Sequence, residues 1–196
     1  MSVVITCYEV PESSDLVIDA GPGGRVHRAL VPGAPFRYIT VGETEPVARL
    51  VGADGTPTAL SGRYALYHSG DSAAPRDPGA GDGALTFINC LVVAPGDEAA
   101  AFAVWSEVNR YMVAKPGYRW HRLHRRLRDD APFGFVNVVR WDTVGAWEAA
   151  HDEGFRALTA RPLPFRPVAT LCELVDGSPL AMPAQRQGDR VESSVR

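Results

Sequence analysis

The sequence contains one pattern twice, and this repeat limits the folds that are open to the chain. The segment HRALVPGAPFRYITV (27–41) aligns without a gap to HRRLRDDAPFGFVNV (124–138), with seven of fifteen positions identical. Upstream, ITCYEV (5–10) matches INCLVV (88–93). The first pair lies 97 residues apart and the second pair 83, so the first half is 14 residues shorter between its two segments. A repeat of this kind predicts two copies of one structural unit that pack against each other.

The second half of the chain shows this unit more completely. Apolar and β-branched runs predict strands, and runs of helix-forming residues predict helices. The expected strands are 85–93, 118–127, 133–140 and 168–174, and the expected helices are 97–114 and 143–158. Within the first helix, one stripe at spacings of three and four residues is formed by Phe102, Trp105, Asn109 and Met112. This βαββαβ order is that of a ferredoxin-like unit, in which both helices cover one face of an antiparallel sheet.

The first half predicts a reduced version of the same unit. Its expected strands are 3–10, 25–30, 36–43 and 63–68, with a short helix near 46–50. The interval that holds the long helix in the second half reads ESSDLVIDAGPGGR here, which is too short and too rich in glycine for a comparable helix. Its GPGG is reminiscent of a phosphate loop, but no helix with the lysine of such a loop follows, so we expect a turn.

The expected fold is therefore α+β, with two tandem ferredoxin-like repeats in a dimeric α+β-barrel-like arrangement. The expected divisions are a degenerate first repeat (1–70), a linker rich in Gly, Pro, Ser and Asp (71–83), the complete repeat (84–176) and a C-terminal tail (177–196). Proteins with a single repeat pair their sheets by dimerising. We therefore expect either a pseudo-dimeric monomer or a homodimer.

Composition narrows the class of protein further. The chain has 196 residues, 45% of them hydrophobic, and a formal charge of −3. No apolar run approaches the roughly 18 residues of a membrane span, and the N-terminus lacks the features of a signal peptide. Cys7, Cys90 and Cys172 are widely spaced and fit reduced core thiols better than a disulfide framework. We expect a cytoplasmic protein that binds no membrane and, because it is mildly acidic, no nucleic acid.

One amide interrupts an apolar strand of the second half. In the segment around FVNVVRW, alternation along a strand would place one set of residues on a single face: Phe133, Phe135, Asn137, Val139 and Trp141. An unpaired buried amide costs about 1–3 kcal/mol. Asn137 therefore needs a partner, which is either the surrounding protein or a ligand.

A second amide, Asn89, lies on an apolar face of the first strand of the same half. The first and third strands of a ferredoxin-like sheet are neighbours, so Asn89 and Asn137 are expected to converge. The first half has Thr6 and Thr40 at the equivalent positions. If the fold itself required these amides, both copies of the repeat would have reason to keep them. Their absence from the first copy favours a ligand site over paired core amides.

The motif VN-x-x-x-W (136–141), followed by an aromatic residue six positions after the tryptophan, resembles the antibiotic-biosynthesis monooxygenase family. Residues 85–175 are most similar to the anthrone oxygenases of aromatic polyketide pathways. The resemblance implies catalytic roles for Asn137 and Trp141. It also matches His124 to a second-strand histidine of these enzymes and Asn89 to a first-strand asparagine of related naphthacenone oxygenases.

Four further residues are expected to bind the substrate, and for Trp147 and Arg161 the expectation comes from the resemblance. These are expected to be Trp147, Arg161, Trp105 and Phe135. Trp147 takes the place of a pocket tyrosine, which keeps the ring but removes a hydroxyl group and any acid role there. Arg161 corresponds to a pocket arginine in an alignment that can slip by two residues.

In an enzyme of this family, O2 oxidises a phenolic polycyclic polyketide intermediate of the anthrone, naphthacenone or angucycline type. The deprotonated substrate supplies the electrons, so no bound cofactor, metal or heme is expected. The region FRALTARPL lacks the histidine with which heme-degrading relatives bind heme, and His121 and His151 have no metal-type spacing. HDE (151–153) is expected on a solvated helix face. His124 is the expected base, with a pKa near 6.5, although His27 at the equivalent position allows a purely structural role.

Alternatives from other functional classes stay open on the sequence alone. The first is an oxygenase that opens a ring by carbon–carbon cleavage with reduced flavin from a separate reductase. The second is a non-oxidative polyketide cyclase, and the third is a protein that binds such a ligand without changing it. In each case the partner is a small aromatic molecule, joined by O2 in the oxidative reactions.

Overall fold

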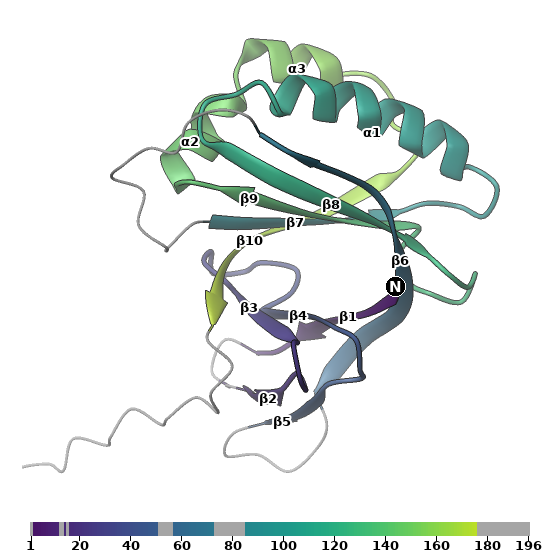
Figure 1. The fold of residues 1–196 in the computed structure, drawn as a ribbon, viewed down its shortest axis with the longest axis vertical. Helices are drawn as coiled ribbons and strands as arrows, with labels where there is room; N and C mark the ends of the chain where they lie inside the picture. Colours follow the sequence, from purple (N-terminus) through teal and green to yellow (C-terminus); the bar gives the residue numbers. More distant parts are fainter. Residues whose placement is uncertain (1, 12–13, 15, 51–56, 73–84, 176–196) are drawn as a thin grey trace, which may run out of the picture.

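The computed structural model describes residues 2–11, 14, 16–50, 57–72 and 85–175 (Figure 1). Its strands are β1 (Ser2–Glu9), β2 (Leu16–Asp19), β3 (Arg25–Ala29), β4 (Tyr38–Gly42), β5 (Val47–Leu50), β6 (Thr58–Asp71), β7 (Leu85–Val92), β8 (Tyr118–Arg126), β9 (Phe135–Trp141) and β10 (Arg166–Val175). Its helices are α1 (Glu98–Met112), α2 (Val144–Ala150) and α3 (Glu153–Thr159). The predicted tail and most of the predicted linker lie outside the described residues.

Eight of these strands form a closed barrel in the order β1-β4-β3-β10-β7-β9-β8-β6. Each half contributes four neighbouring strands in the same relative order, β6-β1-β4-β3 and β10-β7-β9-β8, which is the order of a ferredoxin-like sheet. The halves join where β10 pairs with β3 and β6 pairs with β8, so the second strand of each half meets the fourth strand of the other. The α+β class is confirmed, and the matched order is what a duplicated unit would produce.

Equivalent positions of the two halves meet inside the barrel. Phe36 and Phe133, which the sequence repeat aligns, contact edge to face with ring centroids 5.9 Å apart. The sulfur atoms of Cys7 and Cys90, another aligned pair, are 3.9 Å apart, and all three cysteines are free and buried. Phe133 precedes β9 and packs into the barrel, so the prediction that it shares a face with Asn137 is wrong.

The helices cover only one part of the barrel. All three lie on the outer face of the strands from the second half (Figure 1). The predicted helix 143–158 is two helices, because Asp152 accepts a hydrogen bond from the Phe155 N–H and caps a new helix there. Thr143 caps α2 in the same way through the Ala146 N–H.

The first half differs from its prediction in two places. Val47–Leu50 is strand β5, paired with β2, so the short helix expected near 46–50 is wrong. Four residues are too few to stabilise an isolated helix, whereas a partner strand satisfies their backbone groups. The GPGG segment is a turn, as expected, with Gly21 and Gly23 at φ near 70°. Along the described ranges, no helix is long and apolar enough to cross a membrane.

Candidate functional site

A cavity of ≈ 250 Å³ lies between the helices and the outer face of the second-half sheet. Its floor is formed by β7 and β9, and α1, α2 and α3 surround it. Five of the predicted site residues line it: Asn89, Asn137, Trp141, Trp147 and Trp105. The side chains around them are mostly apolar, so the cavity combines a largely apolar wall with a few polar groups, which is the usual composition of a small-molecule site.

The two predicted amides meet on the floor of this cavity. Asn89 and Asn137 are directly opposite each other in the antiparallel pairing of β7 with β9. The side-chain oxygens of both are buried without a hydrogen-bond partner, and Asn137 is only 6% exposed. Each unpaired oxygen lowers the stability of the empty protein by about 1–3 kcal/mol. A ligand with a hydroxyl group at this point would satisfy them.

Aromatic rings form the walls around the amides. Trp141 is 1% exposed and packs edge-on against Tyr118, with ring centroids 5.0 Å apart. Trp147 lies against Phe87 at 5.8 Å on another side of the cavity. Flat rings of this kind offer contact area to a flat aromatic ligand.

His151 also lines the cavity, between the rings of Trp147 and Phe155, whose centroids are 4.2 and 4.3 Å from its own. The prediction that it lies on a solvated helix face is therefore wrong. The break between α2 and α3 turns it inward. Its Nδ1 lies 2.7 Å from the Trp147 carbonyl oxygen. Since a carbonyl only accepts, Nδ1 carries a proton, and in the neutral ring Nε2 is a proton acceptor.

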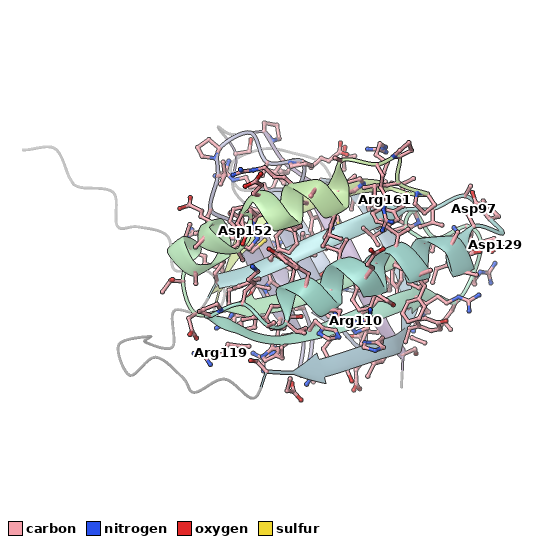
Figure 2. The ribbon with its side chains drawn as sticks, turned by 90° about the horizontal axis from the view of Figure 1, so that it is seen from above. Asp97, Arg110, Arg119, Asp129, Asp152 and Arg161 are labelled. Atoms are coloured by element: carbon pink, nitrogen blue, oxygen red, sulfur yellow. The ribbon has the colours of Figure 1, made fainter. Side chains whose placement is uncertain are left out.

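The break that positions His151 is held by the next residue, Asp152 (Figure 2). One of its carboxylate oxygens accepts a hydrogen bond from the Tyr111 hydroxyl at 2.6 Å, and the other pairs with the Lys115 ammonium at 2.7 Å. Lys115 first, and then Tyr111, hold the pKa of Asp152 well below its usual value. These contacts tie the junction of α2 and α3 to α1 and its C-terminal end.

A chain of hydrogen bonds leads from the cavity to the protein surface. Tyr118 lines the cavity, and its hydroxyl lies 2.7 Å from Nδ1 of His121. Nε2 of His121 lies 2.9 Å from Nδ1 of His68, and the two rings stack at 5.2 Å. His68 belongs to β6 of the first half and is exposed. Each imidazole can accept a proton at one nitrogen while it donates from the other, so the chain can move a proton in either direction.

Burial determines the protonation states of Tyr118 and His121 in this chain of hydrogen bonds. It raises the pKa of Tyr118, so the hydroxyl stays protonated. It also lowers the pKa of His121 to about 4, helped by the neighbouring His68 and Arg122. At neutral pH His121 is therefore an uncharged ring that passes a proton on without retaining it.

The structure places three predicted site residues away from the cavity. His124 points into the barrel interior on the opposite face of the sheet, since its neighbour Leu123 packs under the helices. Arg161, at the end of α3, forms an exposed ion pair with Glu107 (Figure 2). Phe135 is buried in the layer beside the cavity and contacts Tyr67. None of the three is among the residues that line the cavity, although Phe135 shares the helix-facing side of β9 with Asn137, as expected.

Sequence reasoning missed Tyr118 and His121 for a structural reason. Strict alternation would put residues three positions apart on opposite faces of a strand. The pairing of β8 with β9 shifts register between Tyr118 and Trp120, and this irregularity brings Tyr118 and His121 to the same face. Asn109, on the predicted helical stripe, also reaches this network and accepts a hydrogen bond from Tyr118 at 3.2 Å.

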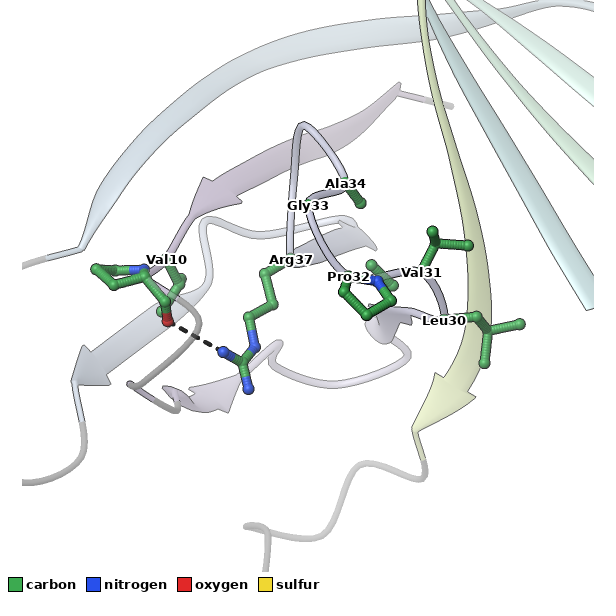
Figure 3. A pocket seen from close by; sticks show the side chains of 9 residues that line it. Val10, Leu30, Val31, Pro32, Gly33, Ala34 and Arg37 are labelled. Carbon is green, nitrogen blue, oxygen red and sulfur yellow. Dashed lines mark hydrogen bonds between the residues drawn. The ribbon is translucent and has the colours of Figure 1, made fainter.

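A larger hollow of ≈ 530 Å³ lies along the loop between β3 and β4 (Figure 3). Its charged side chain, Arg37, donates a hydrogen bond to the Pro11 carbonyl at 3.0 Å. Among its described lining residues there is no carboxylate, histidine or cysteine. In the part of the chain that the structure describes, no group of three or more His, Cys, Asp or Glu side chains is arranged to hold a metal ion.

Comparison with solved structures identifies the fold. Over 92% of this chain and 95% of the other, an anthrone oxidase-like protein superposes with a TM-score of 0.58 at 17% sequence identity. The chain has an anthrone oxidase-like fold. A candidate monooxygenase from Fusobacterium nucleatum subsp. nucleatum matches 88% of the chain and 90% of its own length, with a TM-score of 0.52 at 8% identity. The likeness to antibiotic-biosynthesis monooxygenases that the sequence indicated is thus confirmed at the level of the fold.

A weaker match covers less than half of this chain. SnoaB, a cofactor-independent oxygenase from Streptomyces nogalater, matches 45% of this chain and 90% of its own at 25% identity, but its TM-score is 0.39. No family model matches the sequence, and neither does any curated protein.

Proposed function

We propose that this protein is an oxygenase that uses O2 to oxidise a flat, phenolic polycyclic polyketide intermediate. The intermediate binds in the cavity lined by Asn89 and Asn137, here named the amide cavity. The observation that carries the proposal is the pair of facing amides, Asn89 and Asn137, with unpartnered oxygens in a cavity walled by aromatic rings. Such a site matches a ligand that has flat apolar area and hydroxyl or carbonyl groups on one edge. The anthrone oxidase-like fold supports the same class of reaction.

The size of the cavity favours a compact substrate. Its ≈ 250 Å³ lies just below the range of about 300–1,000 Å³ that is typical of ligand pockets. Among the ring systems indicated by the sequence, a three-ring anthrone is smaller than the four-ring naphthacenone or angucycline skeletons. We therefore favour an anthrone-type substrate, whose rings would lie against Trp141 and Trp147.

The reaction begins with removal of a proton from the substrate. His151 is the base in this proposal, because it lines the cavity and its Nδ1–H bond to the Trp147 carbonyl leaves Nε2 as the acceptor. The resulting enolate is electron-rich and transfers an electron to O2. The amide N–H groups of Asn89 and Asn137 stabilise the negative oxygen, and donors of this kind contribute roughly 3–4 kcal/mol in other enzymes.

The oxidation balances without an external reductant. The substrate CH2 group loses two hydrogens and becomes a carbonyl, one atom of O2 is retained in that carbonyl, and the other leaves as water. Departure of the second oxygen requires a proton. Tyr118 is the donor in this proposal, because its raised pKa keeps it protonated and His121 and His68 can resupply it from solvent.

An oxygen-uptake assay tests the proposal. Purified protein with an anthrone model substrate should consume one O2 per molecule and form quinone absorbance in air, and should form none under nitrogen. Equal turnover under nitrogen would instead establish a cyclase. Turnover only with a flavin reductase would establish the flavin-dependent alternative. Recovery of the intact ligand after binding would establish a protein that binds the ligand without changing it.

A further inference from the structure

A second cavity, of ≈ 400 Å³, lies on the barrel side of the sheet. It is separated from the amide cavity by the sheet itself, since Asn137 and Trp141 face the helices while Val138 and Arg140 face this interior space. Its polar lining is formed by Arg25, His27, Thr86, Arg122, His124 and Arg140. None of these residues lines the amide cavity.

The two halves of the chain supply this lining as a matched pair. Arg25 and His27 come from β3, and Arg122 and His124 occupy the aligned positions of β8, 97 residues later. In the barrel, three strands separate β3 from β8. Alternate residues of both strands point inward, so the two Arg-x-His segments face the same cavity from different sides.

The charge of the cavity is strongly one-sided. Three guanidinium groups line it, and among the residues that the structure describes no carboxylate does. Arg122 has an ion pair with Asp71 at 3.0 Å, but Asp71 is exposed at the end of β6 and is not part of the lining. Arg140 donates a hydrogen bond to the Thr86 hydroxyl. Positive groups gathered around one space favour an anion there.

The buried histidines provide an independent sign of a missing partner. His27 is 4% exposed and His124 is 7% exposed, and Nδ1 of each is buried without a hydrogen-bond partner. Unpartnered buried nitrogens reduce stability unless something in the cavity pairs with them. A ligand that accepts hydrogen bonds would be bound by two imidazole N–H groups as well as by the guanidinium groups.

We propose that this cavity binds a small organic anion through its carboxylate or phosphate group. Guanidinium groups bind both kinds of oxyanion with paired hydrogen bonds. The apolar part of the lining, which includes Val41, Trp120 and Leu174, would hold a small hydrophobic body attached to that group. The site is formed by both halves of the chain and does not depend on the proposed oxygenase activity.

The test follows the histidine side chains directly. Histidine ring nitrogens are observed by NMR while the full-length protein is titrated with inorganic phosphate and, separately, with benzoate, against sodium chloride at equal ionic strength. Saturable shifts of the His27 and His124 resonances with phosphate, benzoate or both support the proposal, and the comparison tells which oxyanion is preferred. Shifts that chloride reproduces, or no shifts at all, overturn it.

A matched pair of charge variants sharpens the test. Arg25 is exposed at its edge of the cavity, so Arg25→Gln removes charge without opening a core. This variant should bind the effective anion at least about tenfold more weakly, since a charge-assisted bond is lost. Arg49→Gln makes the same charge change on exposed β5, outside the lining, and should bind like the unmodified protein. Equal affinities for the two variants would overturn the proposal.

Discussion

Asn89 and Asn137 stand opposite each other on neighbouring antiparallel strands, and the side-chain oxygen of each is buried without a partner. In an apolar sheet this arrangement lowers stability unless a ligand completes it. The equivalent positions of the first half are Thr6 and Thr40, and all three described helices cover the strands of the second half instead. The two amides are therefore found in the half of the barrel that has the cavity and not in the other half.

The first prediction concerns Asn137→Ala. On the proposed mechanism, kcat for the anthrone substrate falls by about 10²-fold, because the amide bond to the negative oxygen strengthens in the transition state. The free energy of unfolding stays the same or rises by up to about 1–3 kcal/mol, since the change removes an unpartnered buried oxygen and breaks no hydrogen bond of that oxygen. Turnover and thermal melting on the same samples measure both effects.

Thr40→Ala is the control for this change. Thr40 is also buried with an unpartnered side-chain oxygen, but it lies on β4 of the first half, away from the cavity. It should leave turnover unchanged. An Asn137→Ala protein that is destabilised by about 1–3 kcal/mol and keeps full activity per folded molecule would show that the amide serves the core.

The second prediction concerns Trp141→Phe. Phenylalanine keeps an aromatic ring against Tyr118 but removes the indole N–H and part of the cavity wall. We expect a loss in kcat/KM of less than about tenfold, which is smaller than that of Asn137→Ala, because ring contact contributes mainly to binding. Steady-state kinetics on the two variants give the comparison, and a larger loss for Trp141→Phe would assign the indole N–H the main role.

Much of the fold could be predicted from the sequence because the repeat and the alternation of apolar residues are properties of local segments. The strand order of the second half and the convergence of Asn89 with Asn137 follow from them. The pairings of β3 with β10 and β6 with β8 could not be predicted, since they join segments from different halves. Such long-range pairing depends on how two sheets meet, which no local pattern encodes.

The site was harder to predict than the fold because small irregularities decide which side chains enter it. The register shift after Tyr118 brings His121 to the helix side of the sheet. The capping of α3 by Asp152 interrupts a helix and turns His151 inward. His124 had the residue type expected of a base, but alternation along β8 sends it to the other face.

The third prediction concerns the proton path. His121→Gln interrupts the chain between Tyr118 and His68, and kcat should fall by about 10²-fold, the lower end of the range for general acid–base catalysis. His68→Gln removes only the exposed end, where water can substitute in part, so its loss should be about tenfold. Added imidazole should restore activity to His68→Gln and not to His121→Gln.

Ser69→Ala is the matched control for the exposed end of this path. Ser69 neighbours His68 on β6 and is exposed, and it has no part in the chain. Its turnover should equal that of the unmodified protein. If His68→Gln behaves like Ser69→Ala under single-turnover conditions, protons reach Tyr118 by another route.

The last prediction is that acid destabilises the protein through buried histidines. Burial, with added repulsion from Arg140 and Arg25, lowers the pKa of His27 to about 4. The unfolded chain therefore binds a proton at His27 near pH 6.5, whereas the folded chain binds it only near pH 4. The stability that this difference contributes is complete above pH 6.5 and is lost as the pH falls. For His27 alone the free energy of unfolding should drop by about 2 kcal/mol between pH 7 and pH 5.

Urea unfolding in chloride buffers free of phosphate and carboxylates measures this drop, and His27→Gln should reduce it while Arg49→Gln leaves it unchanged. A His27→Gln protein with the full pH dependence would show that this histidine is protonated in the folded state.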